Sequence, residues 1–303
     1  MHGLDEMEVL DVVVVGGSFA GQAAAMQLAR ARKRVLLIDA QLPRNRFADA
    51  AHGFLGQDGR RPADIMQDAS RQLLAYPTAA VLHTTVLSVR QEDALFVLTL
   101  ADGTVRRARR LVLGTGVTDT LPAIDGMAER WGKTVLHCPY CHGYEVSGGP
   151  LGIVANHVMS VHQASLIPDW GPATYFTQDT FEPDADGLAL LARRGVAIER
   201  TPVVALLGTA PALDGVRLQD GRIVAMQAVF TAPRTHMSSP LAAQLGCTFA
   251  DGPTGPYIAV DHIGLTSVAG VYAAGDATTP MHNATLAAAS GVLAGIAAHQ
   301  SLM

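Results

Sequence analysis

The sequence predicts an α/β protein of two domains, each a parallel sheet between two layers of helices. Three observations support this prediction. The length of 303 residues corresponds to about two domains, strand-like apolar runs alternate with helix-like segments, and the same order of segments occurs twice. The chain is 49% hydrophobic and only 16% charged. Ordinary soluble domains are roughly 25% charged, so this composition supplies two cores and excludes disorder.

The first forty residues predict a strand, a helix and a second strand. Val12–Val15 is a continuous β-branched run, typical of a parallel strand that is buried on both faces. A Gly-rich turn at 16–21 leads into a segment with helical periodicity, and a second strand, Val35–Ile38, ends at Asp39. We expect an extended loop over 41–62. The remaining elements predicted for this domain are a helix around Ala63–Ala75, strand-like stretches at Val81–Val89 and Leu95–Leu100, an Asp102-Gly103 hairpin turn and the strand Leu111–Leu113.

A second copy of this order begins after residue 150. It comprises the strand Leu151–Ala155, the helix Val158–Ile167, the strand Ala173–Phe176, a hairpin at Asp220-Gly221 and the strand Val229–Thr231. One strand, Val271–Ala274, and one helix, Thr285–Ala298, remain near the end, and without a sheet of their own they must pack on the first domain. We therefore expect one domain over 1–116 plus 239–303, with residues 117–238 inserted as the second.

Charge and composition exclude several classes of protein. The formal net charge is −5, from 22 basic and 27 acidic residues, so nucleic acid is not an expected partner. The basic residues that stand out are Arg106, Arg107, Arg109 and Arg110, beside a predicted strand. No apolar run reaches the ~20 residues of a membrane helix. Asp5, Glu6 and Glu8 occupy the place of a basic signal-peptide region, and three cysteines are too few for a disulfide scaffold. We expect a cytoplasmic protein.

The Gly-rich turn has the spacing of a dinucleotide cradle, Gly16-x-Ser18-x-x-Gly21. Free N–H groups at a helix N-terminus favour a pyrophosphate, and small residues allow its close approach. Asp39 at the end of the next strand is placed to accept hydrogen bonds from a ribose. The alternative is that these glycines only permit tight strand–helix packing. Gly114-Thr115-Gly116 and Gly275-Asp276 also follow strands and are weaker signals.

A Cys-x-x-Cys pair, Cys138-Pro139-Tyr140-Cys141, predicts redox chemistry. At this spacing two thiols form a small reversible disulfide, and one sulfur has a lowered pKa. The alternative is half of a zinc site, for which His137, His142 and His157 are potential ligands, but no second pair is present and we expect no metal. Cys247 is interpreted as a core residue.

Together these motifs resemble the low-molecular-weight thioredoxin reductases and their flavoprotein relatives. The resemblance covers nearly the whole chain and implies two Rossmann-like domains, an FAD domain and an inserted NAD(P)-type domain, in a homodimer. It implies that Gly16–Gly21 and Asp39 hold the ADP half of FAD, that Asp276 binds ribityl-side hydroxyls, that Cys141 faces the flavin and that Cys138 exchanges with substrate. The full set of implied cofactor residues is Gly16, Gly17, Ser18, Phe19, Ala20, Gly21, Asp39, Ala40, Arg44, Asn45, Arg46, His52, Val86, Gly114, Thr115, Gly116, Gly275, Asp276, Asn283, Ala284 and Thr285.

The inserted domain departs from the reductase pattern at its nucleotide site. The turn after Leu151–Ala155 contains no glycine and reads Asn156-His157-Val158-Met159-Ser160. The arginines that bind a 2′-phosphate in the reductases are also missing. Residues 177–180, which follow Phe176, include no basic residue, and the first basic residue after them is Arg193. NADP binding is therefore doubtful.

The residue after the second cysteine also differs, because His142 replaces the reductases' acidic residue. An imidazole can take and return a thiol proton near neutral pH. Cys-x-x-Cys-His-Gly-Tyr-Glu resembles the dithiol oxidases that close disulfides in gliotoxin, holomycin and romidepsin, as do Arg44–Phe47 and His52–Phe54. His137 is a second candidate acid or base, or a histidine that only bonds a loop.

These features predict an FAD-dependent dithiol oxidase that closes a disulfide in a small molecule through Cys138 and Cys141, with O2 as acceptor and H2O2 as product. One alternative is an NADPH-dependent reductase of thioredoxin or a small disulfide. Another is a flavoprotein that sequesters a toxic dithiol. A ferredoxin- or F420-linked reductase is a further enzyme alternative.

Overall fold

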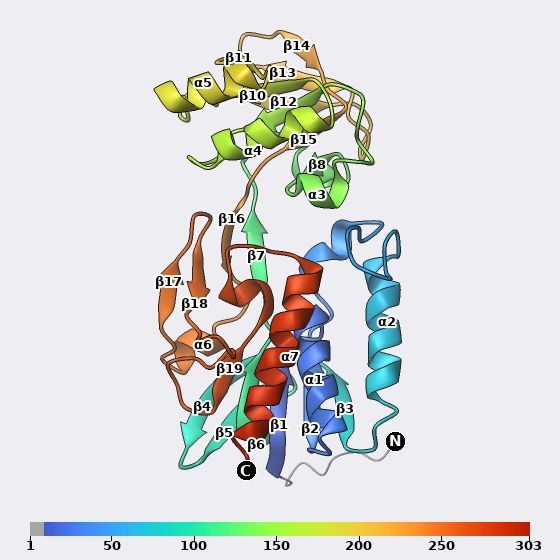
Figure 1. The fold of residues 1–303 in the computed structure, drawn as a ribbon, viewed down its shortest axis with the longest axis vertical. Coiled ribbons are helices and arrows are strands. Elements are labelled where there is room, and N and C mark those ends of the chain that lie inside the picture. The colour runs from blue at the N-terminus through green and yellow to red at the C-terminus, as the bar shows by residue number, and fades with distance from the viewer. Residues whose placement is uncertain (1–8) are drawn as a thin grey trace. The chain divides into compact units, whose positions relative to one another are not determined.

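The computed structural model describes residues 9–303, which form two compact units (Figure 1). The first unit comprises 9–46, 61–118 and 235–303, and the second comprises 47–60 and 119–234. Residues 47–60 were expected in the first unit. They group with the second because Phe47 packs on Gly132, Asp49 forms an ion pair with Lys133, and His52 Nε2 lies 3.3 Å from Glu145 Oε1. Asp5, Glu6 and Glu8, on which the signal-peptide argument rested, lie outside the described residues.

The first unit is built on a seven-stranded sheet in the order β3-β2-β1-β6-β5-β4, with β19 also paired to β6. Strands β1, β2, β3, β6 and β19 run parallel, and β4 and β5 continue the sheet in antiparallel pairing. Their bounds are β1 Val9–Val15, β2 Val35–Asp39, β3 Ala79–His83, β4 Val86–Glu92, β5 Leu95–Leu100, β6 Val105–Leu113 and β19 Val271–Ala273.

Two strand predictions in this sheet were wrong in extent. The stretch Val81–Val89 is two strands, because Thr84 bonds to Asp39 beside β2 whereas Thr85 accepts a bond from Ala101 on the β5 side. Strand β6 starts at Val105, well before the expected Leu111, because its arginine-rich first half pairs with β5. The prediction relied on apolar residues, and it therefore missed the first half of β6, where most residues are arginines.

Helices cover both faces of this sheet. They are α1 Phe19–Arg30, α2 Pro62–Leu73, α6 Leu241–Gln244 and α7 Ala284–Gln300, with short 3-10 turns η1 Arg44–Phe47 and η4 Gly275–Thr278. Helices α1 and α7 lie side by side on one face (Figure 1). The other face is covered by α6 and by the hairpin of β17 Phe249–Asp251 and β18 Pro256–Ile258.

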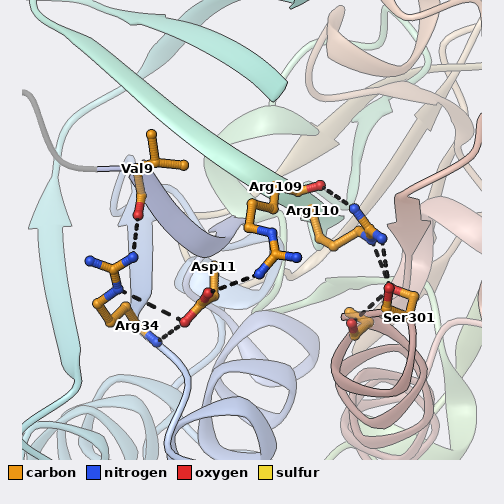
Figure 2. A network of polar contacts seen from close by, with 7 residues as sticks. Val9, Asp11, Arg34, Arg109, Arg110 and Ser301 are labelled. Carbon is orange, nitrogen blue, oxygen red and sulfur yellow. Dashed lines mark hydrogen bonds and ion pairs between the residues drawn. The ribbon is translucent and has the colours of Figure 1, made fainter. Parts of the chain in front are cut away.

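Two arginines of β6, Arg109 and Arg110, make polar contacts within the first unit. Figure 2 shows Asp11 of β1 accepting a hydrogen bond from the Arg34 backbone N–H at 2.9 Å and facing the Arg109 guanidinium at 3.8 Å. Arg110 donates to the Ser301 carbonyl at 2.6 Å, which attaches the end of α7 to the sheet. These contacts join β6 to β1 and to the end of α7.

The second unit contains a five-stranded parallel sheet in the order β11-β10-β9-β15-β8 and a three-stranded antiparallel sheet, β12-β13-β14. The strands are β8 Val135–Leu136, β9 Leu151–Val154, β10 Ala173–Phe176, β11 Ala197–Glu199, β12 Val203–Leu207, β13 Gly215–Leu218, β14 Ile223–Ala225 and β15 Ala228–Phe230. The helices are α3 Pro139–His142, α4 Ser160–Leu166 and α5 Ala185–Arg193, with 3-10 turns η2 Ala128–Arg130 and η3 Ile167–Asp169.

The chain passes between the units near β7 (Val117–Thr120) and β16 (Arg234–Met237), which pair with each other. The predicted fold class, two three-layer α/β domains, is confirmed. Within residues 9–303, no helix has the length and apolar character to cross a membrane.

Candidate functional site

The β1–α1 turn of the first unit requires glycine at both ends. Gly16 has φ +104°, and a Cβ there would lie 2.2 Å from the Gly114 carbonyl oxygen. A Cβ on Gly21 would lie 1.7 Å from the Gly16 oxygen. The strand ends are therefore packed as closely as backbone allows, and the packing explanation of these glycines holds.

The same turn also retains the features that a pyrophosphate needs. Ser18 caps α1 with extended backbone, and its side chain makes no capping bond among the described residues. First-turn N–H groups therefore keep their attraction for an anion. The side chains of Phe19 and Ala20 are buried in the core, so these residues contribute backbone to the cradle.

Asp39 lies directly against this turn. Its Oδ1 accepts hydrogen bonds from Gly17 N at 3.3 Å and from Gln41 N at 3.0 Å. A Cβ on Gly17 would lie 2.4 Å from the Asp39 Cγ, so the second glycine is needed to admit this carboxylate. A carboxylate beside a helix N-terminus fits the ribose and pyrophosphate of a dinucleotide.

Two predicted cofactor residues that are 232 positions apart meet at the same sheet edge. Arg44 Nη1 in η1 lies 3.0 Å from Asp276 Oδ2 in η4, and both side chains are mostly buried. Asp276 follows β19, while Gly114-Thr115-Gly116 follows the adjacent strand β6. The pair therefore places one cationic and one anionic group on the edge where the dinucleotide cradle lies.

The remaining predicted cofactor residues vary in environment. Asn283 caps α7, its Oδ1 accepting from Thr285 N at 2.8 Å and from Leu286 N at 3.3 Å, and Ala284 is the first helical residue. Val86 is buried in the core. Ala40 and Arg46 are exposed, and Asn45 is half-buried.

The dithiol lies at the start of α3 in the second unit. Cys138 caps this short helix with extended backbone, Pro139 occupies its first position, and the Cys141 N–H returns to the Cys138 carbonyl at 3.2 Å. Proline suits a first helical position, where no N–H partner is lost. The two cysteines form a disulfide, with Cα atoms 5.3 Å apart. Both are half-buried.

His142, the last residue of α3, is half-buried beside a charged cluster. Burial lowers the pKa of its imidazole, the Glu145 carboxylate opposes this by raising it, and His52 and Lys133 lower it further. A lowered pKa keeps the ring neutral at pH 7, which is the form that accepts a thiol proton. The His137 carbonyl accepts a hydrogen bond from Gln163 Nε2 at 2.7 Å.

His52 belongs to this cluster in the second unit. Its Nε2 lies 3.3 Å from Glu145 Oε1, its Nδ1 lies 3.6 Å from Asp58 Oδ1, and its ring meets that of His142 edge to face at 6.2 Å. The sequence assigned His52 to the cofactor and did not single out Glu145 or Lys133. The signal for Glu145 was its position three residues after His142 in the Cys-x-x-Cys-His-Gly-Tyr-Glu motif.

The turn after β9 is closed by its own side chains. Ser160 Oγ accepts the N–H groups of Asn156 at 3.1 Å and His157 at 3.4 Å, and His157 Nδ1 accepts that of Met159 at 3.0 Å. The His157 ring is 6% exposed and fills the turn, and burial lowers its pKa. Helix α4 begins at Ser160, two residues later than expected, because 157–160 form this turn.

Two arginines near the end of β11 are paired with carboxylates. Arg200, which follows β11, donates from Nη2 to Glu182 Oε1 at 2.6 Å. Arg222 donates to Glu199 at 2.7 Å and lowers the pKa of that carboxyl to about 2. Cys247 is buried, as predicted, and its thiol is free. Across residues 9–303, His, Cys, Asp and Glu side chains form no group of three that could hold a metal ion.

A dinucleotide cradle in one unit and a disulfide in the other define a flavoprotein of thiol–disulfide redox chemistry. Residues 10–165 match the family model of pyridine nucleotide-disulphide oxidoreductases, and the chain belongs to this family. The expected resemblance to thioredoxin reductases is confirmed, and the cofactor of this group is FAD, which the cradle, Asp39 and Asp276 fit. When bound, FAD would supply the two-electron chemistry.

Two crystal structures and one sequence relative illustrate the similarity. An oxidoreductase from Agrobacterium tumefaciens is 44% identical, with a TM-score of 0.93, over 97% of this chain and 99% of its own. HlmI is 37% identical, with a TM-score of 0.91, over 99% of this chain and 95% of its own. Thioredoxin reductase tcpT from Claviceps purpurea is 30% identical over 97% of this chain and 95% of its own.

Proposed function

We propose that this protein is an FAD-dependent dithiol oxidase that closes an intramolecular disulfide in a small molecule. The observation that carries this proposal is the closed turn after β9. A nicotinamide dinucleotide would need free N–H groups there for its pyrophosphate, and those of Asn156, His157 and Met159 are bonded to side chains of the turn itself. The electrons are therefore proposed to come from the dithiol and not from NADPH.

The described residues support a two-step exchange at the disulfide. A substrate thiolate attacks Cys138 Sγ, the Cys138–Cys141 bond breaks, and Cys141 leaves as a thiolate. His142 takes the proton of the second substrate thiol, and that sulfur then attacks the sulfur bonded to Cys138. The product disulfide forms, and Cys138 is released. The substrate loses two electrons and two protons, and the enzyme disulfide becomes a dithiol.

Bound FAD would accept these two electrons and restore the enzyme disulfide, with O2 as the final acceptor and H2O2 as the product. Gly16–Gly21, Asp39, Arg44 and Asp276 are the residues proposed to hold the cofactor.

Anaerobic reduction distinguishes this proposal from its alternatives. Purified holoenzyme is mixed without oxygen with dithiothreitol, NADPH or NADH, and the flavin absorbance is followed. We expect bleaching with the dithiol alone and one peroxide per cycle after air is admitted. Rapid bleaching by NADPH would overturn the proposal in favour of a reductase, the function that the name of the Claviceps relative suggests.

Replacing one sulfur tests the route through the disulfide. Cys138→Ser should abolish reduction of the flavin by the dithiol, whereas Cys247→Ala, which removes the buried free thiol, should leave it unchanged. Multiple turnover by Cys138→Ser would contradict the mechanism. Stoichiometric binding of the dithiol without turnover by the wild type would favour sequestration.

We also propose that two copies of the chain form a homodimer. Helix α7 leaves Leu286, Leu293 and Ile296 exposed along one side of the first unit, as expected for a surface that a second copy covers. Light scattering on the eluted holoenzyme should give twice the chain mass of 31.8 kDa.

A further inference from the structure

We propose that His52 and Glu145 are positioning residues that act as an opposed pair on His142, setting the acid–base state of the base beside the disulfide. This inference rests on the proposed function for its catalytic meaning, because it assigns partners to the base of that reaction. Its physical content, a coupling among three side chains, stands on the geometry of the second unit.

The contacts form a short chain of groups. His52 Nε2 lies 3.3 Å from Glu145 Oε1, and the His52 ring meets the His142 ring edge to face at 6.2 Å. Glu145 lies three residues after His142, in the turn that follows α3, and its charge acts on the His142 ring. The carboxylate therefore has two imidazole neighbours, and a charge on either ring alters its effect on the other.

The loop that carries His52 is built to hold it in place. Ala51 and Arg60 form a bridge, with Ala51 N donating to the Arg60 carbonyl at 2.8 Å and Gly59 N to the Ala51 carbonyl at 2.9 Å. Gly53, Gly56 and Gly59 have φ of +68°, +74° and +74°, which other residues rarely adopt. Within the same loop, Asp58 Oδ1 accepts a hydrogen bond from Gly53 N at 2.8 Å.

The loop is attached to the dithiol unit at both polar and apolar points. Asp49 forms an ion pair with Lys133, and the Phe47 side chain contacts Gly132, where a Cβ would lie 2.7 Å from that of Phe47. Residues 47–60 lie in the sequence between two segments of the first unit, yet they belong to the second. The loop therefore brings His52 to the unit that carries the dithiol.

The charges around His142 have defined signs. Glu145 raises the pKa of His142, while His52 and Lys133 lower it. Asp58 faces His52 on its other nitrogen, and Asp49 pairs with Lys133. Glu145→Gln removes the attraction and should move the His142 titration to lower pH. His52→Asn removes the imidazole that lowers the pKa of His142 and that faces Glu145, so it should move the titration to higher pH.

The test is a proton NMR titration of histidine-labelled holoenzyme in its resting, oxidised state. The His142 signal is assigned by its loss in His142→Asn. Opposite displacements of its midpoint by Glu145→Gln and His52→Asn are expected, with Glu145→Asp retaining most of the wild-type position. Matched controls are Glu129→Gln and His162→Asn, exposed residues of the second unit, which should leave the midpoint unchanged.

Two outcomes overturn the inference: no displacement in either variant, or displacement in the same direction in both. A merely structural role would disturb both variants alike. The titration needs no turnover, so it separates this inference from the proposed function. If the midpoints move as expected while dithiothreitol fails to bleach the flavin, the oxidase proposal fails and the coupling stands.

Discussion

His142 is neutral at pH 7 because burial of its ring holds its pKa below the ordinary value of 6.5. A neutral imidazole accepts a proton from a thiol, whereas the imidazolium does not. The same position in the reductases holds a carboxylic acid, so the substitution changes the group that exchanges protons with the sulfur. Among single residues, the replacement of this carboxylic acid by His142 is the clearest chemical difference from the reductase pattern.

A pH profile tests this role. The rate of flavin reduction by dithiothreitol should fall as the pH drops through a midpoint below 6.5, because His142 becomes protonated. His142→Asn should lower the rate at pH 7 by about 10²-fold and remove that midpoint. His162→Asn, which alters an exposed histidine of the same unit, should change neither. An unchanged profile in His142→Asn would assign the base to another group.

At the scale of elements, the packing of α7 on α1 determines how the last helix joins the first unit. A Cβ on Gly291 would lie 2.1 Å from the Ala20 carbonyl oxygen, and one on Gly295 would lie 2.7 Å from that of Ala24. Two turns of α7 therefore touch the backbone of α1 directly. This close contact explains why α7 is rich in Ala and Gly, since larger side chains would not fit between the two helices.

We expect Gly291→Ala to destabilise the first unit by about 1–3 kcal/mol, the usual cost of overpacking. The sign is informative, because alanine is the better helix former by ~1 kcal/mol and would stabilise an open site. Ala189→Gly, at an exposed position of α5, should cost ~1 kcal/mol from propensity alone. Urea unfolding followed by circular dichroism compares them, and stabilisation by Gly291→Ala would disprove the contact.

At the scale of the whole molecule, each unit has hydrophobic clusters of its own. The second unit also buries the arginine Arg130, which is 3% exposed. It donates to the carbonyls of Gly126 at 2.8 Å, Gly208 at 2.6 Å and Ala212 at 2.9 Å. These bonds attach the connecting segment before β8 to the hairpin that follows β12, entirely within the second unit.

Arg130→Met should destabilise the second unit selectively, by ~3 kcal/mol or more, because it leaves buried carbonyl groups without donors. Limited proteolysis should show earlier cleavage within 119–234, while FAD release on heating, which reports on the first unit, should stay near the wild-type temperature. Arg222→Met, at an exposed guanidinium, is the control. Simultaneous loss of FAD and of the second unit would show that the two unfold together.

Four features can be read from the amino-acid sequence alone: the order of strands and helices, the dinucleotide turn, the Cys-x-x-Cys pair and the lack of glycine after β9. These features are local, because hydrophobic period, turn chemistry and motif spacing are encoded in neighbouring residues. Only the tertiary structure showed that Arg44 meets Asp276, that residues 47–60 belong to the dithiol unit, and that His157 and Ser160 satisfy the N–H groups of their turn. Such contacts depend on side chains brought together by folding, and no local pattern specifies them.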